Sequence, residues 1–349
     1  MPTTPRRNPS LADVAAAAGV STQTVSRVAN GLDNVRPSTR LQVEVAMKRL
    51  GYRPNRAARA LRTGRFKSIG VVVFTLESFG NMRTVEAIAA AAAADGYSIT
   101  LISALARTRT DVVDAIGRLE EQTVDGVVLL IESHLVDETR IALPQDLPVV
   151  IVDSSIRPDH GLVDTDQAQG ARLATEHLLG LGHQTVHHIS GPVGSISAGH
   201  REAAWRDTLQ QQARAVPEVF RGDWTTRTGF ELGQVIALDD SITAVFASND
   251  QMALGLLRAC HEAGRPVPST LSIVGFDDMP ESASFWPPLT TIHQHFGQVG
   301  RSCIQSLLAA FDGDDEPRQL VIPTRLVVRS STSAPPADRP GRPDPHAPG

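Results

Sequence analysis

From residue 68 onward, short runs of Val, Ile and Leu alternate with helical segments, and this alternation restricts the fold more than any other feature. In the first part, strands are expected at residues 69–74, 98–103, 126–131 and 149–153, and helices at residues 84–96 and 110–122. Continuous apolar runs indicate strands buried on both faces, which is typical of parallel sheets covered by helices. We therefore predict an α/β core that is doubly wound around parallel sheets.

The same pattern begins a second time beyond residue 170. Helices are expected at residues 171–183, 200–212, 227–238 and 251–264, and strands at residues 186–190, 244–248 and 271–278. Two similar lobes in series imply a cleft between them, and ligands of such sheets bind outside the carboxyl ends of the strands. The polar residues at these ends are Asp153, Asn249, Asp250, Asp277 and Asp278.

The N-terminal stretch LADVAAAAGVSTQTVSRVAN, residues 11–30, has a different pattern. Apolar residues recur on one face of a first helix, and Gly19 offers the left-handed conformation that ends it. Ser21 can cap a second helix, which turns Val25 and Val28 inward. The stretch therefore predicts a helix-turn-helix with an exposed face on its second helix.

This exposed face carries the residue types that read DNA. Thr22, Gln23, Ser26 and Arg27 remain outside, and in the major groove a Gln amide suits adenine while Arg suits guanine. Residues 1–67 hold 13 Lys and Arg against three acidic residues, whereas the remainder holds 20 basic and 35 acidic residues. A basic end suits phosphate, so we predict double-stranded DNA as a partner. A pair of amphipathic helices with no such role is the alternative.

Two further segments complete the N-terminal part. A third helix is expected from an N-cap at Ser38, with Leu41, Val45, Ala46 and Leu50 facing inward. Residues 52–67 are basic and too short for a stable isolated helix. They form either a hinge that becomes ordered only when it contacts a negatively charged partner, or an ordinary flexible linker.

Composition excludes several classes of protein. No apolar run approaches the roughly 20 residues that span a bilayer, and no apolar region follows the basic residues of the first nine, so we expect no membrane partner. A cytoplasmic protein, nucleoid-associated when bound to DNA, is the resulting expectation. Cys260 and Cys303 form no close pair, and no nucleophile elbow, phosphate loop or metal-ligand spacing occurs. We expect no enzyme, no cofactor and no metal.

Several motifs together resemble the lactose-repressor family of bacterial transcription regulators. Besides the stretch at residues 11–30, they are GYRPNRAARAL, EHLLGLGH, SISAGHREAAW, GDWTTRTGF, ASNDQMALG, FDDMPESASFWPPLTTIHQHF and LVVRSS. The resemblance covers residues 10–332. It implies a headpiece, a hinge helix and a core like that of periplasmic sugar-binding proteins, in which the chain crosses between the lobes three times.

The domain boundaries follow from this resemblance. They are residues 8–53 for the headpiece, 54–66 for the hinge, 67–165 with 295–322 for the first lobe, 166–294 with 323–332 for the second lobe, and 333–349 for a disordered tail. The final amphipathic helix with which one member of the family forms tetramers is not expected here, because the tail is rich in Pro. The resemblance therefore implies a homodimer that binds an inverted-repeat operator.

The resemblance also assigns residues to DNA. The implied DNA-binding residues are Thr22, Gln23, Ser26, Arg27, Asn30, Asn55 and Leu61. Leu61 matches the wedge that hinge helices insert into the minor groove. We expect it to matter only in the DNA complex.

A second set of residues is implied to bind a sugar effector. It comprises Asp153, Ser197, Arg201, Trp224, Asn249, Asp277, Gln294 and Phe296. Vicinal sugar hydroxyls suit carboxylate, amide and guanidinium groups, and an indole suits the weakly polar face of the ring. Phe74 and Leu130 are expected on the first-lobe side of the pocket, where one member of the family has small polar side chains.

The expected function is a repressor of carbohydrate-utilisation genes that a galactoside-like sugar releases from operator DNA. A transport-linked sugar-binding protein, a non-sugar ligand and a corepressor are the alternatives. Structural roles also remain open for single residues. Trp224 or Phe296 can be simple core, Arg201 can pair with Asp153 or Asp277, and the carboxylates of Asp277 and Asp278 can cap the next segment.

Overall fold

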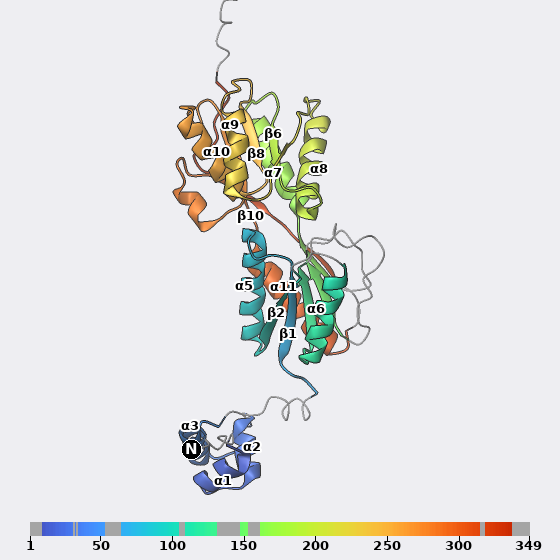
Figure 1. Ribbon diagram of the computed structural model, residues 1–349, viewed down its shortest axis with the longest axis vertical. Coiled ribbons are helices and arrows are strands. Elements are labelled where there is room, and N and C mark those ends of the chain that lie inside the picture. Colours follow the sequence, from blue (N-terminus) through green and yellow to red (C-terminus); the bar gives the residue numbers. More distant parts are fainter. Residues whose placement is uncertain are drawn as a thin grey trace, which may run out of the picture. The chain divides into compact units, whose positions relative to one another are not determined.

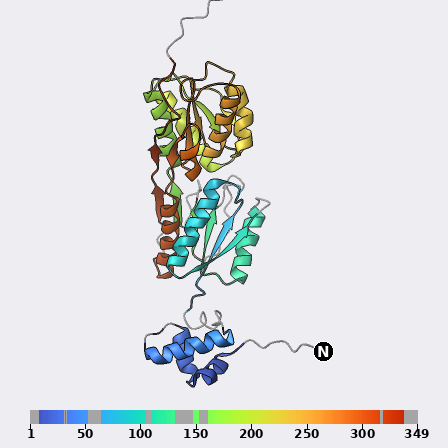
Figure 2. The ribbon, with the colours of Figure 1, turned by 90° about the vertical axis from the view of Figure 1, so that its left-hand side faces the viewer.

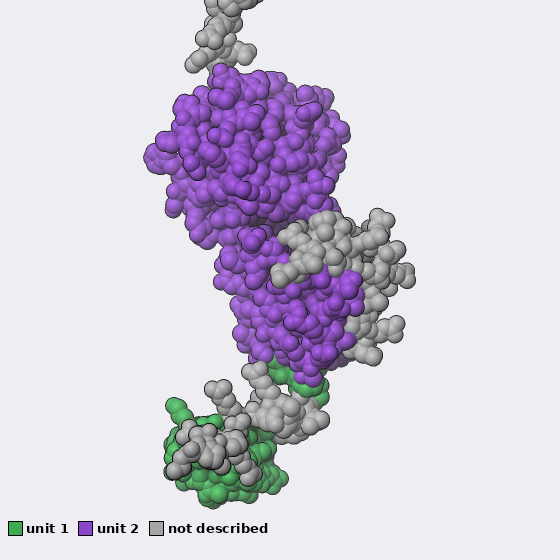
Figure 3. Space-filling model, viewed as in Figure 1, with its two compact units in different colours: residues 1–67 green, residues 68–349 purple. Residues whose placement is uncertain are grey.

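The computed structural model describes residues 9–30, 32, 34–52, 64–104, 109–130, 147–152, 161–314 and 318–336. The chain forms two compact units, residues 1–67 and residues 68–349, which are coloured separately in Figure 3. Among the described residues, no helix combines the length and the apolar character that a bilayer crossing demands.

The described part of the first unit is a small helical domain. Its helices are α1 (Leu11–Ala18), α2 (Thr22–Ala29) and α3 (Pro37–Leu50). Gly19 ends α1 with a φ of 62°, and the Ser21 hydroxyl accepts a hydrogen bond from Thr24 N at 3.1 Å, as the sequence predicts. Val25 and Val28 are buried. These contacts confirm the predicted helix-turn-helix.

The buried face of α3 differs from the prediction. The helix begins at Pro37 rather than after Ser38, and Leu41 and Val45 are 63% and 59% exposed. Val43 is buried instead, whereas Ala46 is buried as predicted. Pro is well suited to the first helical position, and residues three apart, such as Val43 and Ala46, lie on one helix face. The prediction was therefore wrong for Leu41 and Val45 and right for Ala46, and Leu50 packs against the same core.

The second unit is built on two six-stranded sheets, one in each lobe (Figure 1). The first sheet has the order β11-β5-β4-β3-β1-β2 and is parallel throughout. Its strands are β1 (Ser68–Val73), β2 (Ser98–Ser103), β3 (Gly126–Leu130), β4 (Val149–Val152), β5 (Gly161–Thr165) and β11 (Gln319–Ile322).

The second sheet has the order β12-β10-β9-β8-β6-β7, with only β12 antiparallel to its neighbour among the described pairings. Its strands are β6 (His187–Ser190), β7 (Phe220–Arg221), β8 (Ala244–Ala247), β9 (Ser272–Asp277), β10 (Thr290–His293) and β12 (Arg325–Val327). A 3-10 helix, η2 (Pro280–Ser284), follows β9.

Helices cover both faces of each sheet. In the first lobe, α5 (Phe79–Ala94) and α11 (Phe296–Phe311) lie side by side on one face, and α6 (Arg109–Glu121) covers the other (Figures 1 and 2). In the second lobe, α7 (Gln167–Gly180) and α8 (Ile196–Gln211) pack on one face, and α9 (Thr226–Ile236) and α10 (Asp250–Glu262) on the other. This arrangement confirms the predicted doubly wound α/β core.

The described chain passes between the two sheets at three places: from β5 to α7, from β10 to α11, and from β11 to β12. Hydrogen bonds tie these passages to one another. Thr324 N donates to Gln169 Oε1 at 2.7 Å, and Gln167 Nε2 donates to Gln294 Oε1 at 3.5 Å. All three passages therefore contribute to one hinge region between the lobes.

The end of the described chain, residues 331–336, contacts the second lobe and includes the first four residues of the predicted tail. Ser331 is fully buried and its hydroxyl donates to Ile273 O at 2.6 Å. Ser333 N donates to Ser272 Oγ at 3.0 Å, and His183 Nε2 lies 3.0 Å from Ser333 O. Polar contacts to the second lobe fix this segment although it supplies little apolar surface. Residues 337–349 of the predicted tail lie outside the described residues.

Candidate functional site

A cavity between the lobes of the second unit brings together most of the predicted effector residues. It contains about 720 Å³ of empty space, part of it open to solvent. The predicted residues in its wall are Ser197, Arg201, Trp224, Asn249, Asp277, Gln294 and Phe296. Asp153 lies outside the described residues. The cavity lies at the carboxyl ends of the parallel strands, where ligands of this fold class bind.

The guanidinium of Arg201 is held in the cavity by several contacts. Arg201 lies on α8 and is 4% exposed. Its Nε donates to Gln167 Oε1 at 2.9 Å, and its Nη1 donates to the carbonyl of Ser248 at the end of β8. The Cζ atom lies 3.7 Å from the ring centroid of Phe276. Several elements therefore hold the guanidinium in one orientation.

Asp277 presents a buried carboxylate to the same cavity. It ends β9 with a φ of 112°, a left-handed conformation that is rare outside Gly. Gln294 Nε2 donates to its Oδ1 at 2.6 Å. Burial raises the pKa of Asp277 to about 6, although the charge of Arg201 and the Gln294 hydrogen bond oppose this rise. A carboxylate that is buried to this degree binds a hydroxyl donor more strongly than an exposed carboxylate does.

Trp224 supplies an aromatic wall. It has a φ of 74°, which is unusual for a bulky residue, and its indole packs directly on Gly191. A Cβ atom at Gly191 would lie 2.3 Å from the indole, so only Gly allows this packing. Asn249 Nδ2 donates to Trp224 O at 3.0 Å, and Asn249 Oδ1 accepts from Met252 N at 2.8 Å. Asn249 therefore positions Trp224 as well as capping α10.

Other residues of the wall were missed by the sequence prediction. They are Ser78, Phe79, Gly80, Asn81, Thr84, Val152, Asp164, Thr165, Gln167 and Val299. Phe79 meets Phe296 edge to face, with ring centroids 6.0 Å apart. Asp164 and Thr165 end β5, so the rule of carboxyl strand ends would have found them if this strand had been recognised.

Of the two first-lobe residues expected in the pocket, only Leu130 lines it. Phe74 is 3% exposed and packs with Ile102 and Val112 in the core beneath α6. Successive side chains of an extended segment point to opposite faces of a sheet. Phe74 directly follows β1 and lies two positions after Val72, so the two side chains point to the same face of the sheet and belong to the same core.

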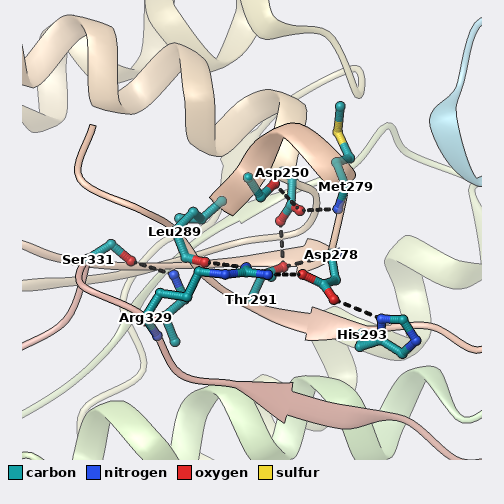
Figure 4. Close-up of polar contacts among 10 residues, drawn as sticks. Asp250, Asp278, Met279, Leu289, Thr291, His293, Arg329 and Ser331 are labelled. Atoms are coloured by element: carbon teal, nitrogen blue, oxygen red, sulfur yellow. Dashed lines mark hydrogen bonds and ion pairs between the residues drawn. The ribbon is translucent and has the colours of Figure 1, made fainter. Parts of the chain in front are cut away.

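Two carboxylates near the strand ends do not line this cavity. Figure 4 shows the polar contacts that they make instead. Asp250 is fully buried and accepts hydrogen bonds from Met279 N at 2.9 Å, Ser282 Oγ at 2.6 Å and Thr291 Oγ1 at 2.5 Å. Asp278 accepts from Arg329 Nη2 at 2.6 Å and lies 2.8 Å from His293 Nδ1. Both carboxylates stabilise the second lobe through these contacts. Of Asp250, Asp277 and Asp278, only Asp277 lines this cavity.

The predicted DNA-reading residues lie on α2 and at its end. Thr22 and Gln23 are exposed, whereas Ser26, Arg27 and Asn30 are half-buried. Asn30 Nδ2 donates to Ser26 O at 2.6 Å, so this amide folds back onto its own helix. Asn55 and Leu61 lie outside the described residues.

An N-terminal capping box was also missed. The Ser10 hydroxyl accepts from Asp13 N at 3.3 Å, and the Asp13 carboxylate accepts from Ser10 N at 2.7 Å. The spacing of Ser10 and Asp13 is the signal that would have predicted it.

Both units match known protein families. Residues 10–55 match the family described as bacterial regulatory proteins, lacI family, and residues 175–332 match a periplasmic binding protein-like domain. The lactose operon repressor of Escherichia coli K12 is 36% identical over 331 residues, which cover 93% of this chain and 91% of the relative. A repressor named PurR from Mannheimia succiniciproducens is 33% identical and covers 92% of this chain and 98% of the relative.

Solved structures agree with this match. The lac repressor dimer bound to operator and the anti-inducer ONPF has a TM-score of 0.83 and 33% identity, and the alignment covers 94% of this chain and all of that chain. The complex of the transcriptional regulator CelR with cellobiose has a TM-score of 0.68 and 32% identity, with 93% of this chain and 99% of that chain covered.

The raised pKa of Asp277 predicts a specific pH dependence of stability. The folded protein holds the Asp277 proton more tightly than the unfolded chain, where the pKa is near 3.8, so this group destabilises the fold as pH rises from about 4 to about 6. The substitution Asp277→Asn removes this pH-dependent decrease in the stability of the fold, because Asn does not ionise. The difference in free energy of unfolding, variant minus parent, should therefore rise by about 2 kcal/mol between pH 4 and pH 7.

Urea denaturation of both proteins at several pH values measures this difference. A constant difference across the range would show that the carboxyl of Asp277 titrates as it does in the unfolded chain.

Proposed function

Because the chain belongs to the lacI family of bacterial regulatory proteins, we propose that it is a transcriptional repressor whose operator binding is controlled by a sugar in the interlobe cavity. The genes it controls serve carbohydrate utilisation, and the sugar is galactoside-like. The observation that carries this proposal is the meeting of Arg201, Asp277, Gln294 and Trp224 in one cavity.

The DNA half of the proposal rests on the first unit. Thr22 and Gln23 project from the N-terminal turn of α2, which is the part of a helix-turn-helix that enters the major groove. Ser26, Arg27, Asn30 and Asn55 belong to the same surface in the proposal, and Leu61 acts as a minor-groove wedge. The lac repressor similar to this chain is a dimer on its operator. We accordingly propose a homodimer on an inverted repeat.

The sugar half rests on the chemistry of the cavity. Arg201 offers directed donors, Asp277 and Gln294 offer an acceptor and an amide, and Trp224 offers an aromatic face. Polyhydroxylated rings need this combination. We also assign Ser197, Asn249, Phe296 and Asp153 to the effector. The CelR regulator similar to this chain forms a complex with cellobiose.

Control of DNA binding follows from the position of the cavity. Its wall combines Phe79 and Asn81 of the first lobe with Arg201 and Asp277 of the second. A ligand that contacts both lobes favours the arrangement in which all contacts are made together, and it shifts DNA affinity by its preference for that arrangement. We propose induction, in which the sugar releases the operator.

Two alternatives stand beside this proposal. The PurR relative is nearly as similar as the lactose operon repressor, so a non-sugar ligand or a corepressor is the second candidate. The periplasmic binding protein-like domain would equally fit a transport-linked sugar-binding protein. The helix-turn-helix, which matches a family of regulators, favours DNA control over transport.

Gln23→Ala tests the reading face of α2. Loss of one bidentate base contact should weaken operator binding by about 1–3 kcal/mol and leave binding to random DNA unchanged, since phosphate contacts supply the non-specific affinity. Gln42→Ala, an exposed Gln on α3, is the matched control. Fluorescence anisotropy on both DNAs measures the effect. An equal loss on operator and random DNA would contradict a reading role for Gln23.

Arg201→Lys tests the effector site. Lys cannot reproduce a planar fork of donors, so the variant should bind operator normally and fail to release it when sugar is added. Arg206→Lys, on the exposed side of the same helix, should respond like the parent protein. Operator binding is measured with a panel of galactosides and glucosides. A full response of the Arg201 variant to the sugar that releases the parent would show that the site lies elsewhere.

A further inference from the structure

The Asp277 carboxylate in the cavity belongs to a strained stretch of backbone, which we call the corner and which consists of Asp277 and Asp278. Asp277 ends β9 with a φ of 112°, and Asp278 follows with a φ of 54°. Both angles lie in the left-handed region, which residues other than Gly seldom adopt. Such conformations persist only where surrounding contacts hold them. The direction of the Asp277 carboxylate therefore depends on the groups that hold the corner.

The side chain of Asp278 makes the first of these contacts. Its Oδ1 atom accepts a hydrogen bond from Arg329 Nη2 at 2.6 Å, and its Oδ2 atom lies 2.8 Å from His293 Nδ1 (Figure 4). Burial alone would raise the pKa of Asp278, but the hydrogen bonds from Arg329 and His293 outweigh it and lower the pKa. The carboxylate is therefore ionised near neutral pH, and the ion pair with Arg329 persists.

Arg329 also contacts the strand next to the corner. Its Nη1 donates to Leu289 O at 2.7 Å, and its backbone N–H donates to Thr290 Oγ1 at 2.9 Å. Leu289 directly precedes β10, and Thr290 is the first residue of that strand. The planar guanidinium thus binds the corner and the beginning of β10 at the same time.

A second carboxylate holds the backbone of the same region. Asp250 is fully buried, and its Oδ2 accepts from Met279 N at 2.9 Å. Its Oδ1 accepts from Thr291 Oγ1 at 2.5 Å, and the same hydroxyl oxygen accepts from Asp278 N at 3.4 Å. Asp250, Asp278 and Arg329 do not line the effector cavity. They can act on a ligand there only by fixing residues that do.

We propose that Asp278 and Arg329 are positioning residues for the effector: their ion pair fixes the corner, and the corner directs the Asp277 carboxylate into the cavity. This inference rests on the proposed function, because it assumes that Asp277 binds the effector. An acceptor that is held in its binding geometry before the ligand arrives saves the cost of ordering it on binding. Arg329 follows β12, so the C-terminal part of the chain contributes to ligand binding without contacting the ligand.

Calorimetric titration of the full-length protein with methyl β-galactoside, lactose and cellobiose tests this inference. Arg329→Gln and Asp278→Asn should each weaken binding of the sugar that binds the parent by about tenfold, the usual strength of one charge-assisted hydrogen bond. Arg329→Lys should keep part of the affinity, because an ammonium group can still pair with Asp278 but lacks the planar fork that reaches Leu289 O at the same time.

Ser331→Ala is the matched control for a loss of stability alone. The Ser331 hydroxyl accepts from Thr290 N at 2.8 Å and donates to Ile273 O at 2.6 Å, two positions beyond Arg329. This variant should lower the free energy of unfolding in urea and leave the sugar Kd unchanged. If Arg329→Gln also lowers stability and leaves the sugar Kd unchanged, the ion pair has only a structural role and the inference is wrong.

A second measurement needs no sugar. Burial raises the pKa of Asp277 to about 6, so this pKa reports whether the carboxylate keeps its place. The stability difference between Asp277→Asn and its parent is measured in urea from pH 4 to pH 7, in the parent, in Arg329→Gln and in Asp278→Asn. In both variant backgrounds the rise of this difference with pH should shrink by at least half, because a carboxylate that leaves its place becomes hydrated.

The two backgrounds separate position from direct electrostatics. Loss of the Arg329 charge would raise the pKa of Asp277 and loss of the Asp278 charge would lower it, whereas displacement of the carboxylate lowers it in both backgrounds. Opposite shifts, or no shift in either background, would overturn the inference even if the sugar binds to the parent. If none of the three sugars binds to the parent, the proposed function fails, and the effector role of the ion pair fails with it.

Discussion

The buried guanidinium of Arg201 sets the arrangement of the cavity, since a charge removed from water must be surrounded by compensating groups. Gln167 and the carbonyl of Ser248 supply acceptors, and Phe276 supplies an aromatic face. Gln167 belongs to the first passage between the lobes, and it contacts Gln294 of the second passage. A ligand that binds Arg201 therefore acts on the same residues that join the lobes.

The fold was predictable because its signals are local. Buried parallel strands require continuous apolar runs, so β2 coincides with the predicted residues 98–103 and β8 with all but the last of 244–248. The third helix of the first unit was harder. Leu41, Val43, Val45 and Ala46 are all apolar, so the sequence there allows more than one inward face. Tertiary packing selects Val43 and Ala46.

The cavity was less predictable, because its geometry depends on contacts between distant parts of the chain. The strand-end rule found Asp277 but also included Asp278, which the backbone turns toward Arg329. Nothing local marks Gln167 as a partner of Arg201, since 34 positions separate them. The left-handed conformation of Trp224 likewise depends on its packing against Gly191 and on the hydrogen bond from Asn249.

Coupling between sugar and operator is reciprocal, so a sugar that weakens operator binding must itself bind the operator complex more weakly by the same factor. Calorimetric titration of the releasing sugar into the full-length protein, alone and saturated with operator duplex, measures this factor directly. We expect the sugar Kd to be roughly 5–150-fold higher in the operator complex. An identical sugar Kd in both titrations would contradict control of DNA binding through the interlobe cavity.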